Sequence, residues 1–325
     1  MITIPIQVSG DTWNNPDSAK EILDQVPPGS QVLLDLCSEG PSLHRLGITN
    51  LINQYDLNVM ITRWSNSVEE VPYTKTYCNS NSHFFPMSYH YWVDEMPNSV
   101  PAEFRFGLFQ GRGCPSRNRI LYDAVNTWPS QFLVSKMSSL HGDNWGIKLP
   151  KHVLSAERVD DWFDNIDHIN EWIASNPVAS IDNHVIQDQY RVPEISSGEM
   201  AKSLFDHYPR FNVELVCETY TLGNTFFPTE KTIRPIVGSK PFVVYGPKHY
   251  LENLKNHNFK TFSQIWDESY DQYEGVERWQ AMTKLINQLM ALSLSEWQEV
   301  IAQAVEITQH NRAVLRKKIR DTKGI

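Results

Sequence analysis

The sequence lacks long apolar runs. Nowhere among its 325 residues do about 18 consecutive apolar residues occur, so we expect no membrane span. The first residues, MITIPIQVSGD, contain neither a basic nor a sustained apolar segment, so we expect no secretory signal. The 4 cysteines form no C-x-x-C pair, and no N-x-[ST] acceptor occurs. These absences predict a cytoplasmic protein with reduced thiols, and they argue against a zinc site or a disulfide framework.

Basic charge is also scarce. Lys and Arg number 29 against 38 Asp and Glu, which gives a net charge of −9. Because neutralising phosphates takes a concentrated excess of cations, general nucleic-acid binding and binding to anionic membranes are not expected. A local basic pocket is still compatible with this balance. A hydrophobic fraction of 41% excludes a disordered chain and suffices for two packed cores.

Apolar runs rich in β-branched and aromatic residues alternate with segments of helical period. The predicted strands are residues 31–36, 58–62, 104–109, 211–217 and 241–245. Helical spacing of apolar residues occurs in 117–128 and 159–174, and the pattern is helical from residue 262 to the basic turn at 316–320. This alternation predicts an α/β fold with mainly parallel sheets.

Two prolines within residues 96–101 predict a domain boundary near residue 100. Residues 66–96 are rich in Ser, Asn, Tyr, Phe and His without a regular period, which favours a functional surface loop over a strand. The aromatic residues of this stretch are compatible with stacking on sugar faces and equally with a packing layer beneath the loop.

A strand, a glycine-rich loop and a helix follow one another in residues 104–122. The loop contains Gly111 and Gly113, and the helix begins with Arg117 and Arg119. Glycines allow close approach of the backbone, a helix start offers free N–H groups, and guanidinium groups match phosphate oxygens, so the pattern predicts an anion site. The dinucleotide fingerprint G-x-G-x-x-G lacks its last glycine here, which disfavours a nicotinamide cofactor. The alternative is an ordinary turn and a helix whose arginines pair with surface carboxylates.

A second pattern lies in residues 211–250. A buried strand ends at Glu218, and a helix that leads to the next strand opens with Glu230 and Lys231. Ligands of open α/β sheets bind at the carboxyl ends of the strands, so these side chains are expected at a crevice. Glu230 also suits a plain helix start, where a carboxylate complements the dipole. The acidic run at 267–271 is compatible with lining the cleft or with a solvated helix start.

Three blocks occur in the order typical of a known family. They are residues 117–126 (RNRILYDAVN), 217–231 (CET, then FPTEK) and 241–246 (PFVVYG). Together they resemble the donor-binding signature of the family 10 glycosyltransferases, the α-1,3/4-fucosyltransferases, over about residues 108–262. This family carries a Tyr where Phe227 stands.

The resemblance implies a GT-B architecture, with two Rossmann-like domains facing across a cleft and long C-terminal helices. Residues 1–100 would form the acceptor domain, 101–275 the donor domain, and 276–325 a helical segment that packs back on both. The implied activity is inverting transfer of a fucose-like sugar from a nucleoside-diphosphate donor, GDP-linked by analogy, to a glycan acceptor. No D-x-D tripeptide occurs, so we expect no metal and no other cofactor.

The resemblance also assigns roles to individual residues. Lys231 and one of the two arginines would neutralise the donor diphosphate, and Glu230 would bind ribose or sugar hydroxyls. The expected donor-binding set is Arg117, Arg119, Glu218, Phe227, Glu230 and Lys231.

The catalytic base is less defined. An inverting transferase needs a base to take the acceptor proton, and the family places a Glu after the second strand of the acceptor domain. Residues 61–66 contain no Glu, so the candidates are Glu70, Glu69 and Glu39. If none of them serves, the alternative is a non-catalytic nucleotide- or sugar-binding protein on the same scaffold. Glucosylation of DNA bases is disfavoured by the acidic charge balance.

Overall fold

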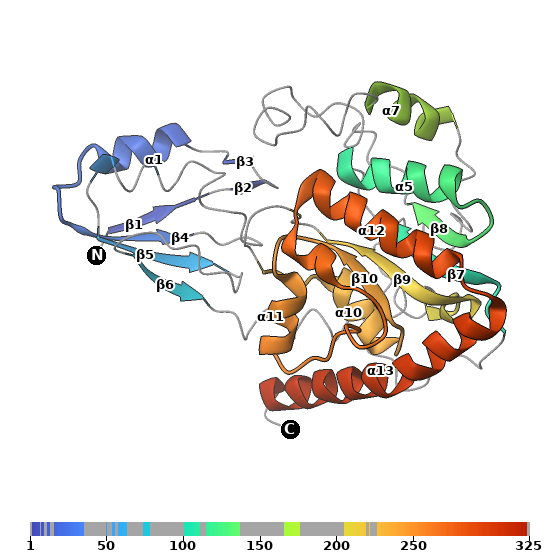
Figure 1. The fold of residues 1–325 in the computed structure, drawn as a ribbon. Coiled ribbons are helices and arrows are strands. Elements are labelled where there is room, and N and C mark those ends of the chain that lie inside the picture. The colour runs from blue at the N-terminus through green and yellow to red at the C-terminus, as the bar shows by residue number, and fades with distance from the viewer. Residues whose placement is uncertain are drawn as a thin grey trace. The chain divides into compact units, whose positions relative to one another are not determined.

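The computed structural model shows a mixed α/β chain with parallel sheets (Figure 1). The structure describes residues 2–6, 8–9, 12–13, 16–35, 50, 54–55, 58–63, 74–78, 101–110, 115–136, 166–175, 205–218, 221 and 226–323. The chain separates into two compact units, one of residues 1–84 and 222–227 and the other of 85–221 and 228–325. The predicted α/β class with parallel sheets is confirmed, whereas the boundaries at residues 100 and 275 stay predictions.

The first unit contains a four-stranded parallel sheet in the order β1-β4-β5-β6. Its core is apolar because Ile4, Val32 and Leu34 are buried on the strands and Leu23 is buried on the helix that packs against β1. A short antiparallel pair of strands, β2 and β3, precedes this helix. The elements are β1 (Ile2–Pro5), β2 (Val8–Ser9), β3 (Thr12–Trp13), α1 (Pro16–Leu23), β4 (Gln31–Asp35), β5 (Asn58–Arg63) and β6 (Thr74–Cys78).

Strand β6 corrects one expectation. The prediction of a loop throughout residues 66–96 is wrong for Thr74–Cys78, which form the edge strand that pairs with β5. The segment T-K-T-Y-C is short and polar, but β-branched and aromatic residues suit strands, and an edge strand tolerates polar composition. Strand β6 therefore gives no apolar run that a periodicity search would detect.

The second unit contains a parallel sheet in the order β10-β9-β7-β8. Its central strands β7 and β9 are mostly apolar and are buried along most of their length, as expected for a sheet covered by helices on both sides. The predicted strands 104–109, 211–217 and 241–245 are confirmed within one residue. The elements are β7 (Phe104–Gln110), α5 (Pro115–Thr127), β8 (Phe132–Lys136), α7 (Ile166–Ser175), η2 (Tyr208–Arg210), β9 (Phe211–Cys217), α10 (Glu230–Val237) and β10 (Phe242–Tyr245).

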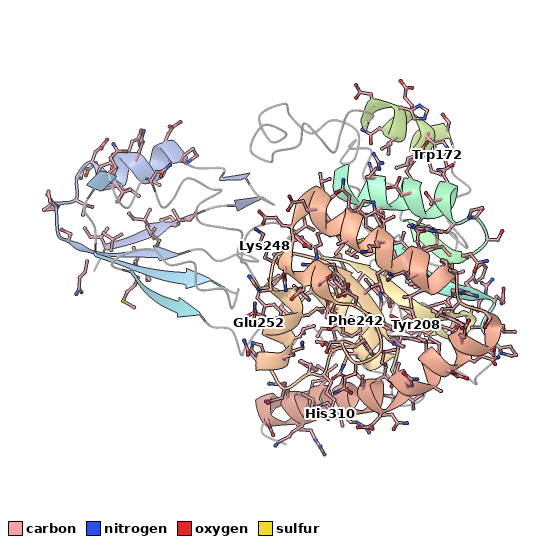
Figure 2. All side chains as sticks on the ribbon, in the orientation of Figure 1. Trp172, Tyr208, Phe242, Lys248, Glu252 and His310 are labelled. Carbon is pink, nitrogen blue, oxygen red and sulfur yellow. The ribbon has the colours of Figure 1, made fainter. Side chains whose placement is uncertain are left out.

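The order of these strands reverses next to β7. From β7 the chain passes through α5 to β8 on one side, whereas β9 and β10 lie on the other side of β7. Right-handed crossovers in opposite directions place α5 and α10 on opposite faces of the sheet. Helix α7 packs on α5, where the ring of Trp172 meets that of Tyr122 edge-on at 5.2 Å (Figure 2). The carboxyl ends of β7 and β9 therefore flank the switch point, where open α/β sheets bind ligands.

Long helices end the chain, as predicted. After β10 come the short helices α11 (Tyr250–Asn256) and η3 (Ser269–Gln272), and then the long helices α12 (Gly275–Met290) and α13 (Leu294–Lys323). Helix α12 packs on β10 and α13 packs on α10, so that α5 and α13 lie above and below the sheet in Figure 1. None of the helices in the described ranges has both the length and the apolar character needed to cross a membrane.

The guanidinium of Arg105 holds the corner between α12 and α13. Its Nη1 donates to the carbonyls of Leu289 (2.6 Å) and Met290 (3.1 Å), and its Nη2 donates to that of Leu292 (2.8 Å). The last carbonyls of a helix have no partner inside the helix, and a cation suits the negative end of the helix dipole. Arg105 lies on β7 and therefore fixes the end of α12 to the start of this strand.

Candidate functional site

The ends of β7 and β9 are joined through the first turn of α5. Nε2 of Gln110, the last residue of β7, donates to the carbonyl of Arg117 at 2.9 Å and lies 3.9 Å from the sulfur of Cys217. Nη2 of Arg117 in turn donates to the carbonyl of Glu218 at 2.9 Å. All four residues are buried. The start of α5 is thus fixed to the end of β9 across the switch point.

Arg119 lies elsewhere on α5. Residues two apart on a helix do not share a face, and Nε of Arg119 pairs with the carboxylate of Asp123 at 2.9 Å. The same carboxylate accepts a hydrogen bond of 2.8 Å from the indole of Trp279 on α12. The structure therefore brings Arg117 to Glu218 and places Arg119 at the contact between α5 and α12.

The carboxylate of Glu218 lies inside the protein, beneath the start of α10. Only 1% of the residue is exposed. It accepts hydrogen bonds from Thr229 N (3.1 Å), Thr229 Oγ1 (2.6 Å), Thr232 Oγ1 (2.6 Å) and the hydroxyl of Tyr250 (2.9 Å). These donors replace the water that a buried carboxylate loses. Glu218 thereby connects the end of β9 to α10 and α11.

Helix α10 begins with a capped first turn. Thr229 is extended (φ −91°, ψ −176°), and its side-chain oxygen accepts from the backbone N–H of Lys231 at 3.3 Å. Threonine at this position and a carboxylate in the first turn are what a helix start favours. The ammonium of Lys231 pairs with Glu230 at 2.5 Å and lies 3.4 Å from the oxygen of Thr229. The predicted helix start at residues 229–231 is confirmed.

The charged side chains described for this site have formal charges that sum to zero. Arg117 and Lys231 are cationic, whereas Glu218 and Glu230 are carboxylates. Because the site has no net positive charge, an anion would be stabilised by the N–H groups of the helix start and by Lys231 once the lysine exchanges Glu230 for the ligand. Phe227, which precedes this turn, is only 4% exposed.

Glu230 is ionised at neutral pH. Burial alone would raise the pKa of its carboxyl, but the ammonium of Lys231 more than offsets burial and lowers this pKa from 4.5 to about 2. Between pH 4.5 and about 2 this carboxyl binds more protons in the unfolded state than in the native state, so lowering the pH in that range weakens the fold. The contribution is complete above pH 4.5 and is lost as the pH falls toward about 2.

We therefore expect the stability difference between the wild type and Glu230→Gln to shrink below pH 4.5. Urea unfolding followed between pH 7 and pH 3 measures this difference. In a Lys231→Met background the same substitution should show much less pH dependence, because the charge that lowers the pKa is gone. A difference that stays constant over the whole range would contradict the assignment.

In the acidic run at 267–271, the position of Asp271 differs from what the sequence predicts. The carboxylate of Asp271, 9% exposed, accepts from the backbone N–H groups of Leu251 (3.0 Å) and Glu252 (3.2 Å) and pairs with Arg278 at 3.0 Å. Asp271 thus caps α11 from inside the protein. Asp271 matches neither the expected cleft lining nor a solvated helix start, whereas the exposed Asp267 accepts from the backbone N–H of Ser269, the first residue of η3, at 2.8 Å and fits a solvated helix start.

Other parts of the expectation concern segments outside the described residues. The base candidates Glu39, Glu69 and Glu70 and the loop at 111–114 lie there. Sequence reasoning missed Gln110, Thr232 and Tyr250. The sequence gives one indication of a role for Gln110, since it is the polar last residue of a mostly apolar strand. It gives no indication for Tyr250, because no local pattern relates the hydroxyl of this residue to Glu218.

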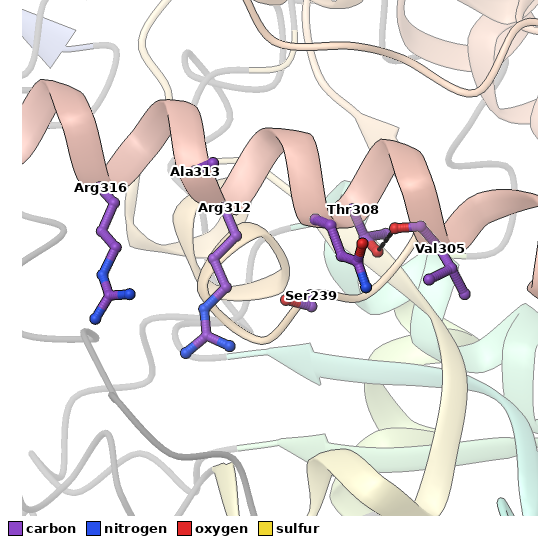
Figure 3. A pocket seen from close by; sticks show the side chains of 7 residues that line it. Ser239, Val305, Thr308, Arg312, Ala313 and Arg316 are labelled. Carbon is purple, nitrogen blue, oxygen red and sulfur yellow. Dashed lines mark hydrogen bonds between the residues drawn. The ribbon is translucent and has the colours of Figure 1, made fainter.

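A groove of about 440 Å³ runs along α13 (Figure 3). Its polar lining consists of Ser239, Thr308, Gln309, Arg312 and Arg316. Ser239 belongs to the turn that enters β10, so the groove lies near the amino end of this strand. Parallel sheets bind ligands at the opposite end, and we therefore place the candidate site at Arg117, Glu218 and the start of α10.

Comparisons with known proteins do not assign the chain to a family or a function. No family model matches the chain, and neither a curated protein nor a solved structure matches it. Within the described ranges no cluster of three or more His, Cys, Asp or Glu side chains is placed to hold a metal ion. The functional argument therefore depends on the geometry of the switch point and on the resemblance of the three sequence blocks.

Proposed function

We propose that the second unit binds the diphosphate of a nucleotide-sugar at the carboxyl ends of β7 and β9. The observation that carries this proposal is the capped start of α10, which presents Lys231 at the switch point of a parallel sheet. Helix N–H groups and a lysine are the usual partners of phosphate oxygens. By analogy with the resembled family, the nucleotide is GDP, and Glu230 binds ribose or sugar hydroxyls.

We further propose that the chain is an inverting, metal-independent glycosyltransferase that moves a fucose-like sugar to a glycan. The acceptor oxygen attacks the anomeric carbon, the bond from this carbon to the diphosphate oxygen breaks, and the nucleoside diphosphate leaves with the electron pair. Fixed cations and N–H groups stabilise the charge that develops on the leaving group. In this proposal the two units form a GT-B arrangement, with the first unit on the acceptor side.

The base would come from the first unit. Glu70, Glu69 and Glu39 are the candidates for taking the proton of the acceptor hydroxyl. A Gln substitution keeps the size of the side chain and removes the basic oxygen. Measuring turnover and donor affinity of the three single Gln variants separates loss of a base from loss of binding.

The second candidate function is a non-catalytic nucleotide- or sugar-binding protein. It is favoured by residues 61–66, which contain no Glu where the resembled family has its base. Turnover of nucleotide-sugars, measured as transfer and as donor hydrolysis in the presence of a chelator, distinguishes the two. Binding without turnover for every donor and acceptor tried would favour the binding protein, whereas activity that requires added Mn²⁺ or Mg²⁺ would contradict metal independence.

Replacing Lys231 with alanine should weaken GDP binding by roughly tenfold or more, because a charge-assisted contact to phosphate is lost. Titration calorimetry measures this affinity, and stabilisation of the wild type by GDP in a thermal melt reports the same event. Lys260→Ala is a matched control, since Lys260 pairs with the exposed Glu306 on α13 at 3.0 Å. Equal affinity of Lys231→Ala and the wild type would remove the diphosphate site from α10.

A further inference from the structure

Thr229 connects the buried Glu218 to Lys231. A threonine hydroxyl has one hydrogen to donate and two lone pairs that accept. In this site the hydroxyl contacts a carboxylate oxygen of Glu218 at 2.6 Å, and a carboxylate can only accept. The single hydrogen of Thr229 therefore points at Glu218.

The remaining contacts of the same oxygen must use its lone pairs. The backbone N–H of Lys231 donates to it at 3.3 Å, and the ammonium of Lys231 lies 3.4 Å away. A hydroxyl that turned its hydrogen toward Lys231 would lose both contacts. The direction of the hydroxyl, and with it the cap of α10, is therefore set by the carboxylate beneath it.

We propose that Glu218 is a positioning residue, which holds the ammonium of Lys231 at the start of α10 by fixing the direction of the Thr229 hydroxyl. Glu218 is too deeply buried to touch a ligand, since it is 1% exposed and accepts hydrogen bonds from Thr229, Thr232 and Tyr250. This inference rests on the proposed diphosphate site. It assigns Glu218 to the support of this site, whereas the sequence resemblance implied a donor contact.

For Glu218→Gln, the change in charge and the loss of positioning should alter the affinity for an anion in opposite directions. Glu218→Gln removes a negative charge beneath an anion site, and this change alone would strengthen the binding of an anion. Glutamine, however, is expected to place its amide oxygen where Oε1 of Glu218 accepts from Thr229 N, Thr232 and Tyr250. Its NH₂ then faces the Thr229 oxygen and takes the place of the acceptor that fixes the hydroxyl hydrogen. Positioning therefore predicts weaker binding, in spite of the more favourable charge.

The test measures the affinity of the full chain for GDP and for inorganic pyrophosphate by calorimetry, with unfolding midpoints recorded in parallel. We expect Glu218→Gln and Thr229→Val each to lower the affinity for both ligands by about tenfold. The double variant should bind no worse than either single variant, because both act through one contact. Thr229→Ser, which keeps the hydroxyl, should bind within about twofold of the wild type.

Thr232→Val is the matched control. It removes another hydrogen bond to the same carboxylate, of 2.6 Å, and the Thr232 hydroxyl also lies 2.7 Å from that of Tyr250. We expect it to lower the unfolding midpoint and to leave both affinities within about twofold of the wild type. Thr229→Val keeps the proposal testable if Glu218→Gln does not fold.

Equal or tighter binding in Glu218→Gln, together with weaker binding in Lys231→Ala, would overturn the positioning role and leave the diphosphate site intact. Thr232→Val with the same loss of affinity as Thr229→Val would also overturn it, because the carboxylate would then act only through stability. A wild type that binds neither probe would overturn the diphosphate site and this inference together.

Discussion

Replacing Glu214 with leucine should destabilise the second unit by about 3–5 kcal/mol, because it removes the carboxylate with which the buried guanidinium of Arg234 pairs. Glu214 is fully buried on β9, and Arg234 on α10 is 6% exposed. Nε of Arg234 donates to the carboxylate at 2.8 Å, and the hydroxyl of Tyr208 donates to its second oxygen at 2.6 Å. Urea unfolding of the single variant measures the loss.

The double variant Glu214→Leu, Arg234→Met should recover most of this stability. An apolar pair of similar volume removes both charges and with them the cost of a buried unpaired ion. The comparison separates the pair's net contribution from the penalty of breaking it. A single variant that loses less than about 1 kcal/mol would show that Arg234 reaches water when Glu214 is gone.

Replacing Arg278 with methionine should also cost about 3–5 kcal/mol, for a different reason. Its side chain is fully buried, and its nitrogens donate to the carbonyls of Val244 (2.9 Å), Pro247 (2.9 Å) and Tyr273 (3.2 Å) and to the carboxylate of Asp271 (3.0 Å). The substitution leaves the buried carbonyls of Val244 and Pro247 and the carboxylate of Asp271 with fewer donors.

Asp271→Asn is the informative comparison for Arg278. The amide oxygen can still accept from the N–H groups that start α11, so a smaller loss is expected. Thermal and urea unfolding of both variants measure the difference. If Asp271→Asn proved as damaging as Arg278→Met, the ion pair would be the main contribution of Arg278, and the carbonyl contacts would be secondary.

The strands of the second unit are predictable because their signal is local. Residues 104–110 and 211–217 are short, mostly apolar segments bounded by polar residues in the sequence, and Thr229 with Glu230 is a typical helix start. The first unit is harder, because strand β6 is an edge strand of mostly polar residues. Local patterns carry no information about strands that lack an apolar face.

The contacts of the site were only partly predictable. The resemblance implies that Arg117, Glu218 and Lys231 share one donor site, and the structure joins Arg117 to the backbone carbonyl of Glu218. It could not tell which side chain faces inward. Glu218 is buried, and its partners Thr232 and Tyr250 come from two different helices. Such long-range pairing depends on the packed fold and leaves no mark in local spacing.

The contact of Arg105 with the end of α12 also affects when the second unit can finish folding during synthesis. Its first partner, the carbonyl of Leu289, lies 184 residues further along the chain. The first strand of the unit is therefore made long before the residues that complete its surroundings. Until residue 292 has left the ribosome, Arg105 must remain hydrated, and the amino end of β7 lacks its final cover. Nascent chains released before this point would expose apolar strands, which makes them substrates for chaperones.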